Sequence, residues 1–234
     1  MKTVQGELED ALTRVLGTTP VLTVAGRTDA GVHAVGQVVS AAEVPDDADP
    51  VKLRDSVNGM CGPWIVVHRC ERAPDDFNAR FDALSRTYVY ALVTGEIADP
   101  WLARTAWHHA SPLDVDGMAE AAGHLLGRHD FSSFGRVPSA DASPVRTLYE
   151  LACSGLGSIV RIRARADAFI QQMVRSLVGT LVTVGEGRTG PDAVADVLAA
   201  RDRAAAGPVA PPHGLCLVSV EYEDGWSRAF DPFQ

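Results

Sequence analysis

The stretch Val21–Gln37, V-L-T-V-A-G-R-T-D-A-G-V-H-A-V-G-Q, contains two strand-like runs joined by a polar turn. Its first five residues are β-branched or apolar, and a second apolar run extends over about 32–42. Two glycines bracket the turn, so the backbone can take a positive φ at both ends. The pattern predicts a strand, a bend and a second strand, with the carboxylate of Asp29 held on the bend.

Two interpretations of this bend are open. Asp29 and Thr28 can simply hydrogen-bond their own turn, as short polar side chains commonly do. Alternatively, Asp29 is a catalytic group, with the guanidinium of Arg27 two residues away. A single D-A-G turn does not distinguish these interpretations.

The decapeptide Ala25–Ala34, A-G-R-T-D-A-G-V-H-A, resembles the signature of the TruA-type tRNA pseudouridine synthases. The resemblance covers most of the chain from Thr3 to about Tyr222. It continues in D-F-N-A-R-F at 76–81, S-R-T-Y at 85–88, D-F-S-S-F at 130–134, A-F-I-Q-Q-M-V-R at 168–175 and G-L at 214–215. The family isomerises uridine to pseudouridine in the anticodon stem-loop of tRNA, at family positions 38–40. The resemblance therefore implies an isomerase, an intramolecular transferase that needs no cofactor, whose catalytic aspartate matches Asp29.

The same resemblance implies substrate-binding roles for Tyr88, Arg27, Arg175 and Arg80. Tyr88 matches the family's active-site tyrosine, expected against the uracil, whereas its strand pattern alone is typical of a core residue. Arg175 lies in an apolar helix, so its guanidinium either pairs with Asp29 or extends to the surface. Arg27 either keeps Asp29 ionised, fills the gap left by the extracted base, or is an ordinary phosphate contact or surface charge. Arg80 is expected in the pocket wall.

The composition is that of a globular protein. The 234 residues are 46% hydrophobic and 22% charged, and no apolar run approaches the roughly 20 residues that span a bilayer. We find no signal-peptide pattern and expect a cytoplasmic protein without a membrane partner. The four cysteines are widely spaced and lack C-x-x-C pairs, which argues against a zinc site and a disulfide framework, and no metal is expected.

The charge opposes RNA binding at first sight. A net charge of -9 disfavours a polyanion, because tRNA affinity depends largely on basic residues that displace counterions from phosphates. The basic residues are, however, 19 arginines and only 2 lysines, and arginine binds phosphate bidentately and stacks on bases. We therefore expect a local basic region on an acidic body.

The periodicity predicts two α+β halves. Residues 1–80 are expected to carry the catalytic bend in the order helix, strand, strand, helix, strand, at 3–16, 21–25, 32–42, 51–58 and 64–70. Residues 81–234 are expected to contain strand, helix, strand, strand, helix and strand at 83–94, 115–126, 145–153, 158–166, 169–184 and 215–222, with an extra helix at 191–201. The second order, βαββαβ, is that of a ferredoxin-like unit.

The first half has the same order without its opening strand. We expect two ferredoxin-like halves whose antiparallel sheets meet around a central cleft, the first half being incomplete. A truncation or a start assigned too late is the expected cause. This leaves a second functional hypothesis, a non-catalytic or impaired RNA-binding or tRNA-folding member of the family. The resemblance also implies a homodimer with tRNA as partner.

Overall fold

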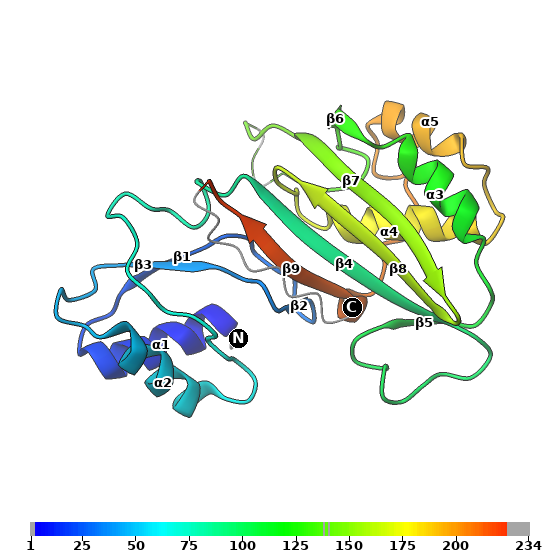
Figure 1. The fold of residues 1–234 in the computed structure, drawn as a ribbon. Helices are drawn as coiled ribbons and strands as arrows, with labels where there is room; N and C mark the ends of the chain where they lie inside the picture. The colour runs from blue at the N-terminus through cyan, green and yellow to red at the C-terminus, as the bar shows by residue number, and fades with distance from the viewer. Residues whose placement is uncertain (1–2, 138, 140, 224–234) are drawn as a thin grey trace. The chain divides into compact units, whose positions relative to one another are not determined.

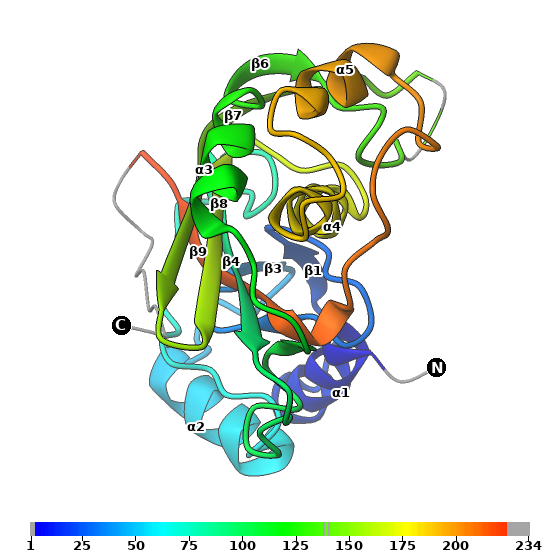
Figure 2. The same ribbon diagram turned by 90° about the vertical axis from the view of Figure 1, so that its right-hand side faces the viewer.

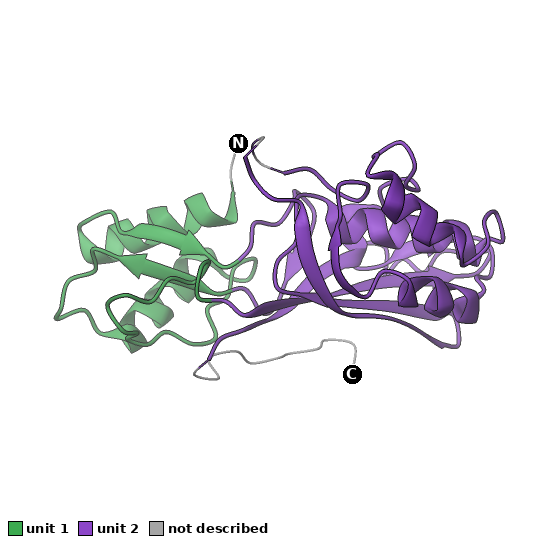
Figure 3. Cartoon of the chain, turned by 90° about the horizontal axis from the view of Figure 1, so that it is seen from above, with its two compact units in different colours: residues 1–25, 38–82 green, residues 26–37, 83–234 purple. Residues whose placement is uncertain are grey.

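The computed structural model describes residues 3–137, 139 and 141–223, and the chain divides into two compact units (Figure 3). Unit 1 contains residues 1–25 and 38–82, and unit 2 contains residues 26–37 and 83–234. The sequence predicted one boundary after residue 80. The bend that carries Asp29 instead groups with unit 2, because residues 33–36 bind to a strand of that unit.

Unit 1, as far as it is described, combines two helices with a two-stranded antiparallel sheet (Figure 1). Helix α1 (Val4–Leu16) follows Thr3, whose hydroxyl accepts a hydrogen bond from the Gly6 amide, and ends at Gly17 in the left-handed region, with φ 74°. A threonine N-cap and a glycine stop are common helix boundaries, and this predicted helix is confirmed. The remaining elements are β1 (Val21–Val24), β3 (Val39–Ala42) and α2 (Pro50–Cys61).

The strand predicted over 64–70 is not found in the described structure, and that prediction was wrong. The Asn58 side chain donates to the Val67 carbonyl (2.9 Å) and accepts from the Val67 amide (2.7 Å). The backbone of Val67 is therefore bound by a side chain and not by a neighbouring strand. Trp64 and Val66 are 85% and 51% exposed, so the apolar residues that suggested a strand are not core residues.

Unit 2 contains most of the predicted second half. Its elements include β2 (His33–Ala34), β4 (Ser85–Thr94), β5 (Trp107–His109), α3 (Val115–Gly123), β6 (Gly127–Asp130), β7 (Val145–Leu156), β8 (Ile159–Ala166), α4 (Met173–Gly185), α5 (Ala193–Ala200), a 3-10 turn (Pro212–Gly214) and β9 (Leu215–Glu221). The short strands β5 and β6 were not predicted. In the described parts of both units, every helix is too short or too polar to cross a bilayer.

The sheet of unit 2 is mainly antiparallel. Within the described residues its strand order is β2-β9-β4-β8-β7-β6, with β5 added beside β4. Strand β4 pairs antiparallel with both β8 and β9, and β7 pairs antiparallel with β8. Strands β2 and β5 pair parallel with their neighbours. Helices α3 and α4 lie on one face of this sheet (Figure 2).

The burial pattern of the two central strands, β4 and β8, distinguishes the two faces of the sheet. All residues of β4 except the last are buried, as expected for a strand covered on both faces. In β8, I-V-R-I-R-A-R-A, buried aliphatic residues alternate with half-buried ones, three of which are arginines. The period of two assigns the aliphatic side chains to one face and the arginines to the other.

The single strand predicted over 32–42 is interrupted. The Gln37 side chain accepts a hydrogen bond from the Gly26 amide (3.3 Å) and donates one to the Gly26 carbonyl (2.7 Å). Before this point the amides of Val35 and Gly36 donate to the Leu217 carbonyl of β9. After it, β3 pairs with β1. The run changes its strand partner, which an uninterrupted apolar pattern does not reveal.

Helix α4 begins four residues later than the predicted start at Phe169. Gln172 has a positive φ of 65°, and Gln171 exchanges backbone hydrogen bonds with Arg136 (3.0 Å each). A residue paired in this extended way cannot also lie in a helix. The late start brings Arg175 into the first turn of α4.

Gly179 is the position in α4 where a side chain has no space. A Cβ there would lie 1.6 Å from the carbonyl oxygen of Pro208, and a Cβ on Gly207 would lie 2.9 Å from the carbonyl oxygen of Gly179. We expect Gly179→Ala to lower the free energy of unfolding by about 3 kcal/mol, the upper part of the overpacking range, because backbone must move. Urea denaturation measures this change. The matched control Gly123→Ala, with no atom within 4 Å of its Cβ, should not destabilise the protein; an equal loss in both variants would contradict the prediction.

Candidate active site

The bend that carries Asp29 is a closed turn. Its base is fixed by the two hydrogen bonds between Gln37 and Gly26. At its tip the Val32 amide donates to the Asp29 carbonyl (3.0 Å), and Gly31 has φ 86°. Glycine takes this conformation at little cost, so the sequence A-G after Asp29 suits the turn. The carboxylate therefore projects from a fixed backbone.

The Asp29 carboxylate forms an ion pair with Arg175. Arg175 Nη1 lies 2.8 Å from Asp29 Oδ2, and the side chains are 14% and 29% exposed, respectively. The Nε of the same guanidinium donates to the Ala210 carbonyl (2.7 Å), and the Ala210 amide donates back to the Arg175 carbonyl (3.1 Å). Of the two interpretations of Arg175, pairing with Asp29 is confirmed. The carboxylate is thus held by a cation that is itself fixed to the backbone.

Tyr88 is buried beside this pair. It is 7% exposed, and its ring meets the Phe169 ring edge-on at 5.3 Å between centroids. Burial raises the pKa of Tyr88 to about 12; the positive charge of Arg86 lowers it and the negative charge of Asp29 raises it. The phenol is therefore neutral at physiological pH, and it interacts electrostatically with the candidate catalytic carboxylate.

Arg27 and Arg80 have different surroundings. Arg27 is exposed on the bend, and within the described residues it makes no hydrogen bond or ion pair. Arg80 belongs to unit 1, where its guanidinium lies over the Phe81 ring at 5.5 Å from the centroid. Within unit 2 the structure brings Asp29, Arg175 and Tyr88 together.

Sequence reasoning did not identify three of the groups that build the site. They are the Gln37 side chain, the Ala210 carbonyl and the Phe169 ring. Gln37 is a polar residue within an apolar run, and Ala210 lies in the proline-rich segment G-P-V-A-P-P at 207–212. Both were detectable signals of a special role. The groups that Gln37 and Ala210 bind could not be predicted, because these partners are distant in sequence or bind through the backbone.

The raised pKa of Tyr88 predicts a loss of stability at high pH. An unfolded tyrosine titrates near 10, whereas folded Tyr88 keeps its proton to about 12. Between these values the unfolded chain binds fewer protons, so the free energy of unfolding falls as pH rises, by up to about 1.4 kcal/mol per pH unit. Denaturation in urea at several pH values from 9 to about 12 measures this slope. For Tyr88→Phe the free energy of unfolding should fall less steeply with pH than for the parent. Identical slopes would refute the raised pKa of Tyr88. Burial also raises the pKa of Tyr90, and this second tyrosine contributes equally to both proteins.

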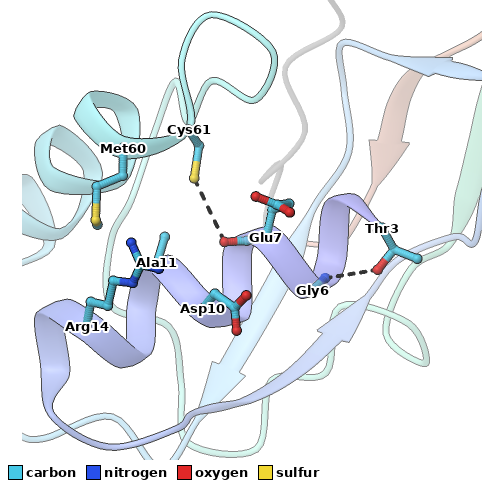
Figure 4. A pocket seen from close by; sticks show the side chains of 8 residues that line it. All are labelled: Thr3, Gly6, Glu7, Asp10, Ala11, Arg14, Met60 and Cys61. Atoms are coloured by element: carbon cyan, nitrogen blue, oxygen red, sulfur yellow. Dashed lines mark hydrogen bonds between the residues drawn. The ribbon is translucent and has the colours of Figure 1, made fainter. Parts of the chain in front are cut away.

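A hollow in unit 1 lies outside this cluster. It has a volume of about 390 Å³ and lies beside α1 and the end of α2 (Figure 4). The Sγ of Cys61 points to the Glu7 carbonyl across it, at 3.9 Å. Its charged lining is Glu7, Asp10 and Arg14, a net negative set that does not favour a nucleic acid. The candidate active site is therefore the Asp29 cluster.

Residues 121–223 match the family model described as tRNA pseudouridine synthase. The class that this model describes, the pseudouridine synthases, consists of isomerases.

The similarity to curated relatives is more extensive. The chain is 46% identical over 222 residues to the tRNA pseudouridine synthase A of Burkholderia mallei (strain SAVP1), covering 94% of this chain and 82% of that protein. It is 45% identical over 221 residues to the tRNA pseudouridine synthase A of Rhodopseudomonas palustris (strain BisA53), covering 94% of this chain and 89% of that protein. The chain belongs to the tRNA pseudouridine synthase A (TruA) family.

Proposed function

We propose that this chain converts uridine to pseudouridine in the anticodon stem-loop of tRNA, with Asp29 as the catalytic carboxylate. The observation that supports this most directly is the ion pair of Asp29 with Arg175 beside the buried Tyr88. The reaction breaks the bond from ribose to the base nitrogen and rejoins the base through carbon. It needs one carboxylate of fixed orientation, and the bend supplies one.

In this proposal each residue of the cluster has a separate task. The target base leaves the stack at a cost of a few kcal/mol, which stacking and backbone contacts offset. Tyr88, with its neutral phenol, lies against the uracil and keeps water away from it. Asp29 then acts as nucleophile or as base at the nucleoside. Arg175 orients the carboxylate through its fixed guanidinium.

Arg27 and Arg80 are assigned to the RNA. The exposed guanidinium of Arg27, two residues from Asp29, either fills the space that the extracted base leaves or binds an adjacent phosphate. Arg80 is exposed on unit 1 and is assigned to the pocket wall by its place in the family motif. Neither assignment affects the choice of Asp29 as the reacting group.

We further infer a ferredoxin-like topology for unit 2. The strands β4, β7, β8 and β9 occur in the spatial order β9-β4-β8-β7, all antiparallel, with α3 after β4 and α4 after β8. This is the order of a split βαββαβ unit. For unit 1 the ferredoxin-like relation stays a prediction, as do the homodimer and the cytoplasmic location.

The experiment that tests the proposed function is mapping of pseudouridine by primer extension after chemical derivatisation. Unmodified tRNA is incubated with the protein, and tRNA binding is measured in parallel. We expect new stops in the anticodon stem-loop and none in a control without protein. Binding without conversion would reject the enzyme and favour the second hypothesis, a non-catalytic RNA-binding member of the family.

A further inference from the structure

Strand β8 presents a row of arginines on the sheet face away from α3 and α4. Arg161, Arg163 and Arg165 alternate with the buried side chains of the strand, so their side chains share one face. Alternate residues of a strand are about 6.6–6.8 Å apart, which spaces the three guanidinium groups along a line of about 13 Å. We call these three residues the arginine row.

The neighbouring strands hardly neutralise the arginine row. Of its six directly paired residues on β4 and β7, only Glu150 is acidic; the others are Thr87, Val89, Ala91, Ala152 and Ser154. Glu150 contacts Arg163 at 3.3 Å and Arg165 at 3.9 Å. Counted over the row and these six paired residues alone, three positive charges and one negative charge sum to +2, although the whole chain carries -9.

Further features of the same face suit a phosphate ligand. The side chains of Arg163 and Arg165 are 36% and 38% exposed, and the Arg165 guanidinium lies over the Tyr149 ring at 5.1 Å. Stacking of this kind leaves the edge of the guanidinium free to bind an anion in the plane of the group. Arg128, exposed on β6, is paired with Thr147 at the far side of β7 and adds positive charge.

The positive charge of the arginine row also indicates which kind of partner this face binds. A second copy of this chain bound through the same face would form a two-fold interface, in which each patch meets itself. Two copies of the arginine row would then be brought together, and their like charges would repel each other. A polyanion gains from the same charges, because each neutralised phosphate releases condensed counterions.

We propose that the arginine row binds the phosphate backbone of tRNA outside the site of Asp29, and that it adds affinity without taking part in the reaction. The identity of the ligand rests on the proposed function. The evidence for the arginine row as a binding surface is independent of that function: it is the register of β8 and the charge of its side chains. Because the contact is made equally before and during the reaction, it lowers KM and leaves kcat unchanged.

The test compares two double variants of equal charge. Arg163→Gln with Arg165→Gln removes two charges from the row, and Arg188→Gln with Arg201→Gln removes two from exposed side chains outside it, 65% and 69% exposed. Binding of unmodified tRNA is measured from 0.05 to 0.3 M salt. We expect the row variant to bind roughly tenfold more weakly at 0.1 M salt, with the slope of log K against log salt reduced by about 1 to 2. The control variant should match the parent, as should the urea midpoints of both.

Two further variants separate charge from packing. Glu150→Gln removes the acidic group of the row and should tighten tRNA binding, whereas Arg163→Lys with Arg165→Lys should keep most of the salt slope. With the active parent, the row variant should raise KM and leave kcat within about twofold.

An unchanged salt slope in the row variant would overturn the inference. So would dissociation of a parent oligomer by the same variant, since this would assign the face to a second copy. If the parent binds tRNA without converting it, the proposed function fails, and the salt slopes still decide the inference.

Discussion

Replacing Asp29 by asparagine is expected to abolish uridine conversion while leaving tRNA binding intact. The amide keeps the size of the carboxylate but removes its charge, so it can act neither as a nucleophile nor as a base. Single-turnover formation of pseudouridine should fall by roughly 10³-fold or more, since the loss of a general acid or base alone costs 10²- to 10⁴-fold. Filter binding with unmodified tRNA should give a dissociation constant close to that of the parent.

The control for this variant is a second aspartate-to-asparagine change. Asp192 is 94% exposed and contacts only His124 among its described ion-pair neighbours, at 3.3 Å. Asp192→Asn removes the same charge, and conversion should stay at the parent rate. Conversion by Asp29→Asn within a few-fold of the parent would show that another residue carries the reaction.

Replacing Arg175 by methionine is expected to lower turnover by roughly 10²-fold. Methionine fills the space of the arginine stem but loses the contacts to both Asp29 and the Ala210 carbonyl. The carboxylate then keeps its charge but loses the group that orients it, and misplacement by about 1 Å can cost 10²-fold. The measurement is single-turnover conversion, with the urea midpoint recorded to exclude unfolding.

A charge-conserving variant separates orientation from simple packing. Arg175→Lys keeps a cation near Asp29 without the planar guanidinium, so it should recover part of the lost turnover. Arg188→Met, at a site 65% exposed, should have no effect. Parent-level turnover in Arg175→Met would mean that the ion pair only stabilises the fold.

Local sequence signals predicted the elements that depend on local interactions. Helix α1 has its cap residue Thr3 and its stop at Gly17 within the sequence itself. The strands predicted at 145–153 and 158–166 are found as β7 and β8, and the short turn between them contains Gly157, with φ 60°. These signals work because the interacting residues are close neighbours in the chain.

The errors occurred where a distant group satisfied the backbone. The run at 64–70 has strand-like residues, but Asn58 binds the backbone of Val67. The run at 32–42 changes from β9 to β1 as its strand partner near Gln37. An apolar pattern reports the preference of a segment for burial and does not report which group will bind its backbone.

By itself the sequence determined the class of fold, the family, and the candidate residues Asp29, Tyr88 and Arg175. Motifs and hydrophobic periodicity are properties of neighbouring residues in the chain, so they can be recognised without a structure. Only the tertiary structure decided that Asp29 and Arg175, 146 positions apart, form an ion pair, and that the Ala210 carbonyl fixes that arginine. It also decided that the arginines of β8 share a face with a single acidic neighbour among their directly paired residues. The physical reason is that the sequence shows an arginine in an apolar helix, where burial of its guanidinium costs free energy. Which group compensates this cost depends on the tertiary packing.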